Sequence, residues 1–160
     1  MATQNLSEYS YTPPFESKNY TIGIVTSEWN SDVTKNLLQG CLETLRKMGV
    51  LDQNIHSKFV PGSYELPLGA QLILEHIKPD AVICLGSVIQ GDTKHFDFVC
   101  QAISLGIKDV SLKYNKPVIF GVLTDNTKQQ ALDRSGGTLG NKGIEAAITA
   151  VKMIQLQKTF

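Results

Sequence analysis

Four short apolar runs alternate along the chain with longer segments whose apolar residues recur at helical spacing. The runs cover residues 20–26, 55–60, 81–85 and 117–123, and their many valines and isoleucines favour buried β-strands. The last run, PVIFGVL, is apolar throughout, as is typical of a parallel strand covered on both faces. The alternation predicts an α/β fold, namely a three-layer, doubly wound sandwich around a four-stranded parallel sheet.

The first two helices have clear boundary signals. Ser31 or Asp32 is expected to cap the start of a helix whose apolar face runs from residue 33 to 48, and Gly49 is expected to close it. The second helix should begin near Pro67, because the missing N–H of proline is tolerated in the first turn of a helix. Its apolar face is expected to consist of Leu68, Leu72, Ile73 and Ile77.

The second half of the chain contains three more helical segments. Gly86 is expected to end the third strand, and apolar spacing from residue 98 to 110 predicts a long helix. Residues 124–127 should cap a short helix that ends near Arg134. After a glycine-rich stretch, Asn141 is expected to start the final helix.

The N-terminal segment, residues 1–19, is polar and has no periodic pattern. We expect it to be a tail, or an exchanged strand that Tyr9, Tyr11 and Phe15 pack onto a neighbouring subunit. Residues 20–160 then form a single domain, since a chain of this length can bury one substantial core.

Charge and cysteine content narrow the class of protein. Fifteen Lys and Arg balance fifteen Asp and Glu, so no excess of positive charge points to nucleic acid or to an anionic membrane. No apolar run is long enough to span a bilayer, and the N-terminus lacks the pattern of a secretion signal, so we expect a cytoplasmic protein. Cys41, Cys84 and Cys100 are interpreted as buried thiols without a metal-binding spacing.

The chemistry-bearing residues gather after the predicted strands. In doubly wound folds, ligands bind at the carboxyl ends of the strands, and these ends meet at one edge of the sheet. There the chain places Trp29 and Asn30, residues 63–65, residues 88–95 and residues 120–127. This clustering predicts one composite site.

The stretch LGSVIQGDTKHFDFVC, residues 85–100, is the strongest candidate within that site. It combines a strand end, a Gly91-Asp92-Thr93 loop and a helix start, and a helix N-terminus attracts anions. His95 in the first turn can take and give protons near neutral pH. The alternative from these residues alone is that Thr93 is only a cap and that the histidine is structural or solvated.

Three other residues have two interpretations each. Trp29 offers a face for stacking a heterocycle or is a core residue at the start of a helix. Glu65 could bind hydroxyls or serve as an ordinary first-turn acid, and Arg134 could clamp phosphate or be an exposed helix-end cation. The first loop, SEWNSD, has no glycine, which argues against a dinucleotide or flavodoxin phosphate loop at that position.

Four segments together carry a family resemblance: VPGSYELP (60–67), GSVIQGDTKHFDFVC (86–100), PVIFGVLT (117–124) and QALDRSGGTLGNKGIEAA (130–147). With these the sequence resembles the 6,7-dimethyl-8-ribityllumazine synthase family, whose fold is flavodoxin-like. The resemblance implies condensation of 5-amino-6-(D-ribitylamino)uracil with 3,4-dihydroxy-2-butanone 4-phosphate, the penultimate step of riboflavin biosynthesis. The implied reaction needs no metal or redox cofactor.

The resemblance also implies a role for individual residues. His95 matches the proton-transfer histidine, Arg134 the phosphate-binding arginine, and Gly91, Asp92 and Thr93 the phosphate loop. The matches to the pocket for the pyrimidine and its ribityl chain are Trp29, Asn30, Ser63, Tyr64, Glu65, Val88 and Ile89. Phe120, Lys142 and Glu145 match residues that complete the pocket from an adjacent subunit.

Family sites lie between subunits of a pentamer, and some members join twelve pentamers into a 60-subunit shell. The short turn at residues 136–141 is like that of the members that form shells. The resemblance also implies riboflavin synthase as a partner. Trp29 stands where the family usually has phenylalanine, which suggests tighter retention of flavin. The rival interpretations are a non-catalytic flavin-binding or shell-forming relative and a flavodoxin-like electron-transfer protein.

Overall fold

The computed structural model describes residues 5, 7 and 15–160. The α-helices are α1 Ser31–Lys47, α2 Leu66–His76, α3 His95–Tyr114, α4 Lys128–Asp133 and α5 Lys142–Gln157. The main strands are β1 Ile22–Ser27, β2 Ile55–Val60, β3 Ala81–Ile89 and β4 Val118–Asp125. A small hairpin of β5 Ser135–Gly137 and β6 Gly140–Asn141 precedes α5, and short 3₁₀ turns cover Phe15–Asn19, Asp52–Asn54 and Ser63–Glu65.

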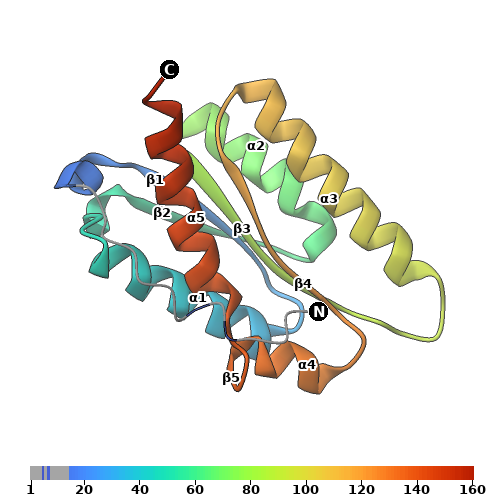
Figure 1. Cartoon of the computed structure of the whole chain (residues 1–160). Coiled ribbons are helices and arrows are strands. Elements are labelled where there is room, and N and C mark those ends of the chain that lie inside the picture. Colours follow the sequence, from blue (N-terminus) through green and yellow to red (C-terminus); the bar gives the residue numbers. More distant parts are fainter. Residues whose placement is uncertain (1–4, 6, 8–14) are drawn as a thin grey trace.

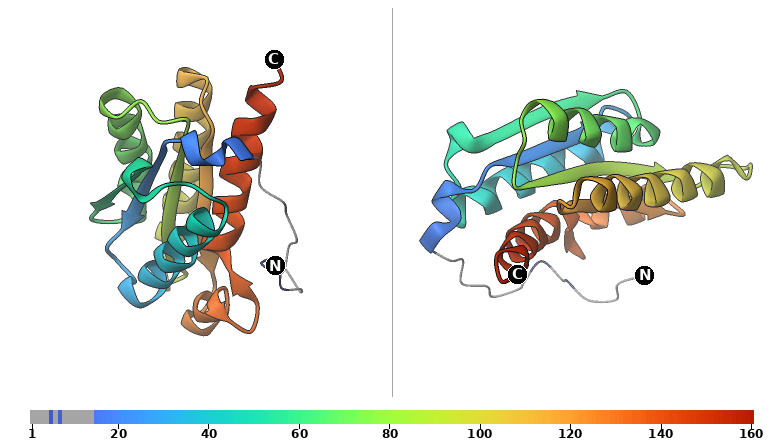
Figure 2. Two further views of the ribbon diagram at one scale, coloured as in Figure 1. Left: turned by 90° about the vertical axis from the view of Figure 1, so that its left-hand side faces the viewer. Right: turned by 90° about the horizontal axis from the view of Figure 1, so that it is seen from above.

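The four main strands form one parallel sheet in the order β2-β1-β3-β4. Helices α1 and α5 cover one face of this sheet, and α2 and α3 cover the other, so that the chain forms three layers (Figure 1, Figure 2). The fold predicted from the alternation of apolar runs is therefore confirmed. Because β1 pairs with both β2 and β3, the strand order reverses at β1, and the crevice for a ligand is expected there.

Two apolar clusters hold the layers together, one on each face of the sheet. On one face, Leu37 and Cys41 of α1 and Ala147 of α5 pack against strand residues such as Ile24 and Ile83. On the opposite face, α2 and α3 pack against the alternate strand residues, including Val25, Val82, Cys84, Val118 and Val122. Each strand of the sheet centre thus contributes to both cores, which explains its continuous apolar sequence.

The third strand is longer than predicted, because it continues through Gly86 to Ile89 and pairs with β4 from Val82 to Ile89. Gly86 allows a close approach instead of ending the strand: a Cβ at this position would lie 2.6 Å from the Ser63 hydroxyl oxygen. The strand extension carries Val88 and Ile89 to the edge of the sheet where the site lies.

The prediction that Ser31 or Asp32 caps α1 was wrong. The residue before the helix is Asn30, which adopts a left-handed conformation with φ of 55°, a conformation that asparagine tolerates better than most residues. Leu68 and Leu72 also differ from the prediction. They were expected on the apolar face of α2, but their side chains are 59% and 46% exposed in the single chain. Gly69 and Ala70 instead allow α2 to lie close to the sheet.

The expected exchanged strand falls largely on residues 1–4, 6 and 8–14, outside the described residues, and so do Tyr9 and Tyr11. In the described part, Asn5 and Ser7 lie against the β5–β6 hairpin, where the Ser7 hydroxyl accepts a hydrogen bond from the Asn141 N–H at 2.6 Å. Within the described residues, none of the helices has the length and apolar content needed to cross a membrane.

Candidate active site

A pocket of about 370 Å³ opens at the carboxyl ends of β1 and β3, beside the point where the strand order reverses. Backbone hydrogen bonds fix its rim, because the N–H groups of Glu28 and Trp29 donate to the carbonyls of Val60 and Pro61 at 2.8 and 3.1 Å. Three chain segments meet there. The predicted site residues that line it are Trp29, Asn30, Ser63, Tyr64, Glu65, Val88, Ile89 and His95.

Two large aromatic side chains stand at this pocket with most of their surface exposed to solvent. Trp29 is 71% exposed and Tyr64 is 62% exposed, so neither is a core residue of the single chain. The Trp29 indole lies over Gly62, where an added Cβ would be 3.4 Å from its nearest ring atom. Of the two interpretations of Trp29, the structure agrees with an accessible stacking face.

Polar groups line the inner wall of the pocket. The Asn30 side-chain amide donates to the Ser87 carbonyl at 3.0 Å, and the Ser63 hydroxyl donates to the Ser27 hydroxyl at 3.3 Å. The buried Ser87 hydroxyl has no hydrogen-bond partner among the described residues, although buried hydroxyls are normally bonded. The pocket therefore combines these polar groups with an apolar wall of Val88 and Ile89.

Glu65 occupies a defined position at the mouth of the pocket. One of its carboxylate oxygens accepts a hydrogen bond from the Gly62 N–H at 2.9 Å, which closes the turn before α2. This bond orients the carboxylate and leaves its second oxygen available to a ligand hydroxyl. The two sequence interpretations of Glu65 are thus compatible, since the same side chain shapes the turn and faces the pocket.

His95 is the first residue of α3, and its exposed side chain lines the same pocket as Trp29. Its backbone N–H donates to the Thr93 hydroxyl at 3.3 Å, so Thr93 satisfies one of the free amides at the helix start. Gly91, Asp92 and Thr93 are exposed and lead directly into this helix N-terminus. The imidazole therefore lies between the pocket and a loop suited to an anion.

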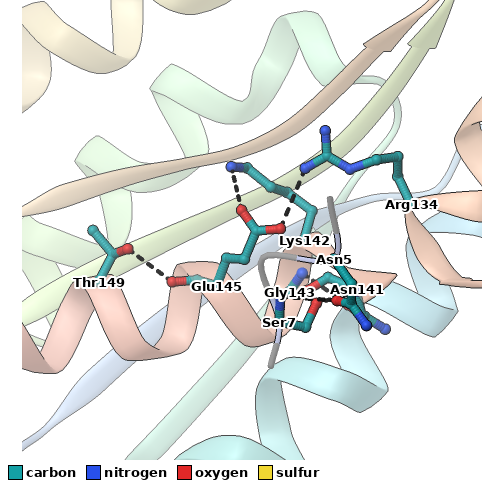
Figure 3. Close-up of polar contacts among 8 residues, drawn as sticks. All are labelled: Asn5, Ser7, Arg134, Asn141, Lys142, Gly143, Glu145 and Thr149. Carbon is teal, nitrogen blue, oxygen red and sulfur yellow. Dashed lines mark hydrogen bonds and ion pairs between the residues drawn. The ribbon is translucent and has the colours of Figure 1, made fainter. Parts of the chain in front are cut away.

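Arg134, Lys142 and Glu145 form a separate cluster and do not line this pocket (Figure 3). A guanidinium N–H of Arg134 donates to one oxygen of Glu145 at 3.3 Å, and the Lys142 ammonium donates to the other at 2.8 Å. The three side chains are only 16%, 29% and 12% exposed, respectively. A largely buried carboxylate shared by two cations makes a compact site with one net positive charge.

The β5–β6 hairpin brings these three residues together. Thr127 caps α4 as predicted, and α4 ends at Asp133, with Arg134 as its C-cap residue. The hairpin then folds back so that the Lys142 N–H donates to the Arg134 carbonyl at 2.9 Å. Asn141 caps α5 through a 2.8 Å bond from the Gly143 N–H, and it also donates to the Asn36 carbonyl of α1. Glu145 follows one turn later on α5.

Phe120 lies apart from both groups. It belongs to β4 and faces the layer of α2 and α3, where it lines a shallow hollow with Ile107, Ser111 and Val118. The single chain therefore brings eight of the expected residues to one pocket, whereas Phe120, Lys142 and Glu145, which were expected to act from a neighbouring subunit, lie outside it. Arg134, which was expected to bind phosphate, lies with Lys142 and Glu145 and does not line the pocket.

Three residues of the pocket were not singled out from the sequence, namely Gly62, Ser87 and Val99. No motif distinguishes Ser87 from the other serines of the chain, and Val99 carries no chemical signal. The length of the β3–β4 pairing is the feature that would have indicated Ser87, since it sets which residues reach the carboxyl edge of the sheet.

None of the three cysteines lines the pocket. Cys41 and Cys84 are fully buried, and burial raises the pKa of each thiol to about 12, so both are neutral at physiological pH. Cys100 is half-buried, so the prediction of burial holds fully only for the first two. Across residues 5, 7 and 15–160, no group of three His, Cys, Asp or Glu side chains is placed to hold a metal ion.

Comparison with known proteins gives a uniform result. A family model described as 6,7-dimethyl-8-ribityllumazine synthase matches residues 19–158. Proteins of that name from Cytophaga hutchinsonii and Parabacteroides distasonis are 56% and 51% identical to this chain, in each case over 96% of both chains. The one from Flavobacterium psychrophilum is 50% identical over 98% of this chain and 83% of its own length. This chain is therefore a member of the 6,7-dimethyl-8-ribityllumazine synthase family.

Proposed function

We propose that this chain condenses 5-amino-6-(D-ribitylamino)uracil with 3,4-dihydroxy-2-butanone 4-phosphate in the pocket beside His95. The amine of the pyrimidine attacks the ketone, water leaves to give an imine, and phosphate is eliminated. Ring closure then expels a second water and yields 6,7-dimethyl-8-ribityllumazine. The observation that supports this most is that one pocket joins an exposed indole, polar groups and an imidazole at a helix N-terminus.

The pyrimidine ring stacks on Trp29, and its ribityl hydroxyls bind Glu65, Ser63 and the Asn30 region. The Ser87 carbonyl fixes the direction of the Asn30 amide, because it accepts a hydrogen bond from that side chain at 3.0 Å. His95 exchanges protons with the reacting amine and ketone, because it lines the pocket without being buried in it. The pocket contributes further by holding two reactants together, which removes much of the entropic barrier.

The phosphate of the second substrate is held from two sides. Gly91, Asp92 and Thr93 present backbone amides and the positive end of the α3 dipole. Arg134 supplies a guanidinium whose geometry suits two phosphate oxygens. Asp92 turns its carboxylate away from the bound phosphate.

A complete site requires two adjacent subunits, one contributing the His95 pocket and the other contributing Arg134, Lys142, Glu145 and Phe120. The separation of these two groups within one chain supports this division. Exposed apolar side chains suited to subunit contact are also present on α2 and α3, where Leu68, Phe98 and Leu112 are 59%, 67% and 73% exposed.

The subunits assemble as pentamers in the cytoplasm, and twelve pentamers form a hollow 60-subunit shell. The short β5–β6 turn supports the shell over a free pentamer. The N-terminal segment adds to the sheet of a neighbour, and riboflavin synthase is a partner of the assembly. Analytical ultracentrifugation distinguishes the two assemblies, because their masses differ about twelvefold.

The direct test is to mix the two substrates with purified protein and to follow the absorbance band of the lumazine. Enzyme-dependent formation of that band, together with stoichiometric phosphate release, is the expected result. Tight flavin binding without turnover would contradict the proposal and favour the non-catalytic relative. A redox-active flavin in the purified protein would favour the electron-transfer alternative.

The Trp29→Phe variant is expected to bind riboflavin about three- to tenfold more weakly, because the smaller ring covers less of the flavin. Isothermal titration with riboflavin measures this, since the method does not depend on the fluorescence of the lost indole. Phe59→Leu is the control: this exposed aromatic on β2 does not line the pocket. Equal riboflavin affinity of the Trp29→Phe variant and the unaltered protein would refute the hypothesis.

A further inference from the structure

Two buried serine hydroxyls meet behind the wall of the His95 pocket. Ser27 is the last residue of β1 and is fully buried, whereas Ser63 belongs to the turn before α2 and lines the pocket. The Ser63 hydroxyl donates to the Ser27 hydroxyl oxygen at 3.3 Å. Ser27 does not line the pocket itself, so it can affect a ligand only through Ser63.

The sheet holds these two hydroxyls side by side. Side chains alternate along a strand, so Ser27 points with Val25 to the face that α2 covers, where Ser63 lies. Gly86 of β3 lies directly against Ser63, since an added Cβ at this glycine would be 2.6 Å from the Ser63 hydroxyl oxygen. The backbone of β3 therefore keeps the Ser63 side chain beside Ser27.

The Ser63 hydroxyl has a single proton, and both acceptors within its reach belong to the protein wall. They are the Ser27 hydroxyl oxygen at 3.3 Å and the Ser87 carbonyl oxygen at 3.5 Å. The Ser87 carbonyl already accepts from the Asn30 amide at 3.0 Å, which leaves Ser27 as the nearer and less occupied acceptor. With its proton directed into the wall, the Ser63 oxygen keeps lone pairs for a donor of the ligand.

We propose that Ser27 is a positioning residue that takes the proton of Ser63, so that Ser63 offers the substrate a hydrogen-bond acceptor. The group that it receives is a hydroxyl of the ribityl chain, which donates to the Ser63 oxygen. This inference rests on the proposed function and specifies how the pocket recognises the pyrimidine substrate. A ligand with only an acceptor at this place, such as an ether or ketone oxygen, is disfavoured because lone pairs would face each other.

Packing does not account for the hydroxyl of Ser27. A buried hydroxyl costs free energy unless it is hydrogen-bonded, and alanine would fill nearly the same space without that cost. Within the described part of the chain, Ser63 is the hydrogen-bond partner of the Ser27 side chain. Removal of both hydroxyls should therefore be nearly neutral for the stability of the fold, whereas it should weaken substrate recognition.

A double-mutant cycle tests the inference, with the affinity of the assembled protein for 5-amino-6-(D-ribitylamino)uracil measured by isothermal titration. Ser27→Ala should weaken binding about three- to tenfold, as expected for one hydrogen bond, and Ser63→Ala should do the same. In the Ser63→Ala background, Ser27→Ala should have no further effect. The KM for the phosphate substrate should not change in any of these variants.

Two further variants separate hydrogen bonding from packing. Ser27→Cys keeps a side chain of similar shape but provides a poor acceptor, so it should weaken binding as much as Ser27→Ala does. Thr26→Val is the matched control, because it removes a buried hydroxyl from the neighbouring position of β1, on the opposite face of the sheet. It should bind the pyrimidine like the unaltered protein.

Unchanged pyrimidine affinity in both Ser27→Ala and Ser27→Cys would overturn the inference. An equal loss of affinity from Ser27→Ala in the presence and absence of the Ser63 hydroxyl would also overturn it, since Ser27 would then not act through Ser63. Normal binding by Ser27→Cys beside weak binding by Ser27→Ala would assign the effect to packing. Failure of the unaltered protein to bind the pyrimidine would contradict the proposed function itself.

Discussion

Replacement of His95 with alanine is expected to lower kcat by about 10²-fold, the lower end of the range for a positioned acid–base group. The imidazole lies at the pocket and beside the α3 N-terminus, where it can move protons during imine formation, phosphate elimination and ring closure. Its loss should leave pyrimidine binding nearly intact, because the stacking and hydrogen-bonding groups belong to other segments of the chain.

Single-turnover kinetics together with titration of the pyrimidine substrate measure the two effects separately. His76→Ala is the matched control, since His76 is an exposed histidine at the end of α2 and does not line the pocket. It should behave like the unaltered protein. A loss of pyrimidine affinity as large as the loss of rate would show that His95 binds the substrate instead of moving protons.

The Arg134→Ala variant is expected to raise the KM for the phosphate substrate about 10- to 100-fold, because hydrogen bonds between charged groups are the stronger ones. The KM for the pyrimidine should change much less. Deletion of the guanidinium also leaves Glu145 paired with Lys142 alone. The phosphate group of the substrate then meets a cluster without net positive charge. The KM of the Arg134→Lys variant for the phosphate substrate should fall between those of the unaltered protein and Arg134→Ala. Lysine keeps the positive charge but cannot donate two parallel hydrogen bonds to phosphate.

Arg46→Ala provides the control for Arg134, because Arg46 is the other arginine of the chain and forms an exposed ion pair with Asp52. It should leave both KM values unchanged. Steady-state kinetics with each substrate varied in turn gives the comparison. A KM for the phosphate substrate that stays the same in Arg134→Ala would remove Arg134 from the site.

Most of the fold could be predicted because strands that are buried on both faces appear in the sequence as continuous runs of apolar residues. The run from residue 117 to 123 and the cap at Asn141 are examples, and the structure confirms both with shifts of one or two residues. The end of β3 was misplaced because glycine is a strand breaker by propensity. At Gly86 it is required instead by the close approach of Ser63 and Leu66, which is a tertiary contact.

The site could be predicted in part, for a similar reason. Trp29, Ser63 and His95 follow three different strands, and parallel strands bring their carboxyl ends to one edge, so their meeting follows from topology. The position of Arg134 depends on the β5–β6 hairpin, which is too short to leave a periodic pattern. It lies with Glu145, away from the pocket, and chain order alone does not determine this.

The central claim is that the His95 pocket of one subunit works with the Arg134 cluster of its neighbour. Co-assembly of His95→Ala and Arg134→Ala subunits tests it most directly, because a mixed contact can combine an intact pocket with an intact cluster. With the phosphate substrate far below its KM, where each single variant alone is nearly inactive, an equal mixture should recover about a quarter of full activity, as expected for random neighbours in a ring. A mixture of His95→Ala subunits with the doubly substituted chain should recover none. If the two single variants together are no more active than each alone, both residues act within one subunit and the account is wrong.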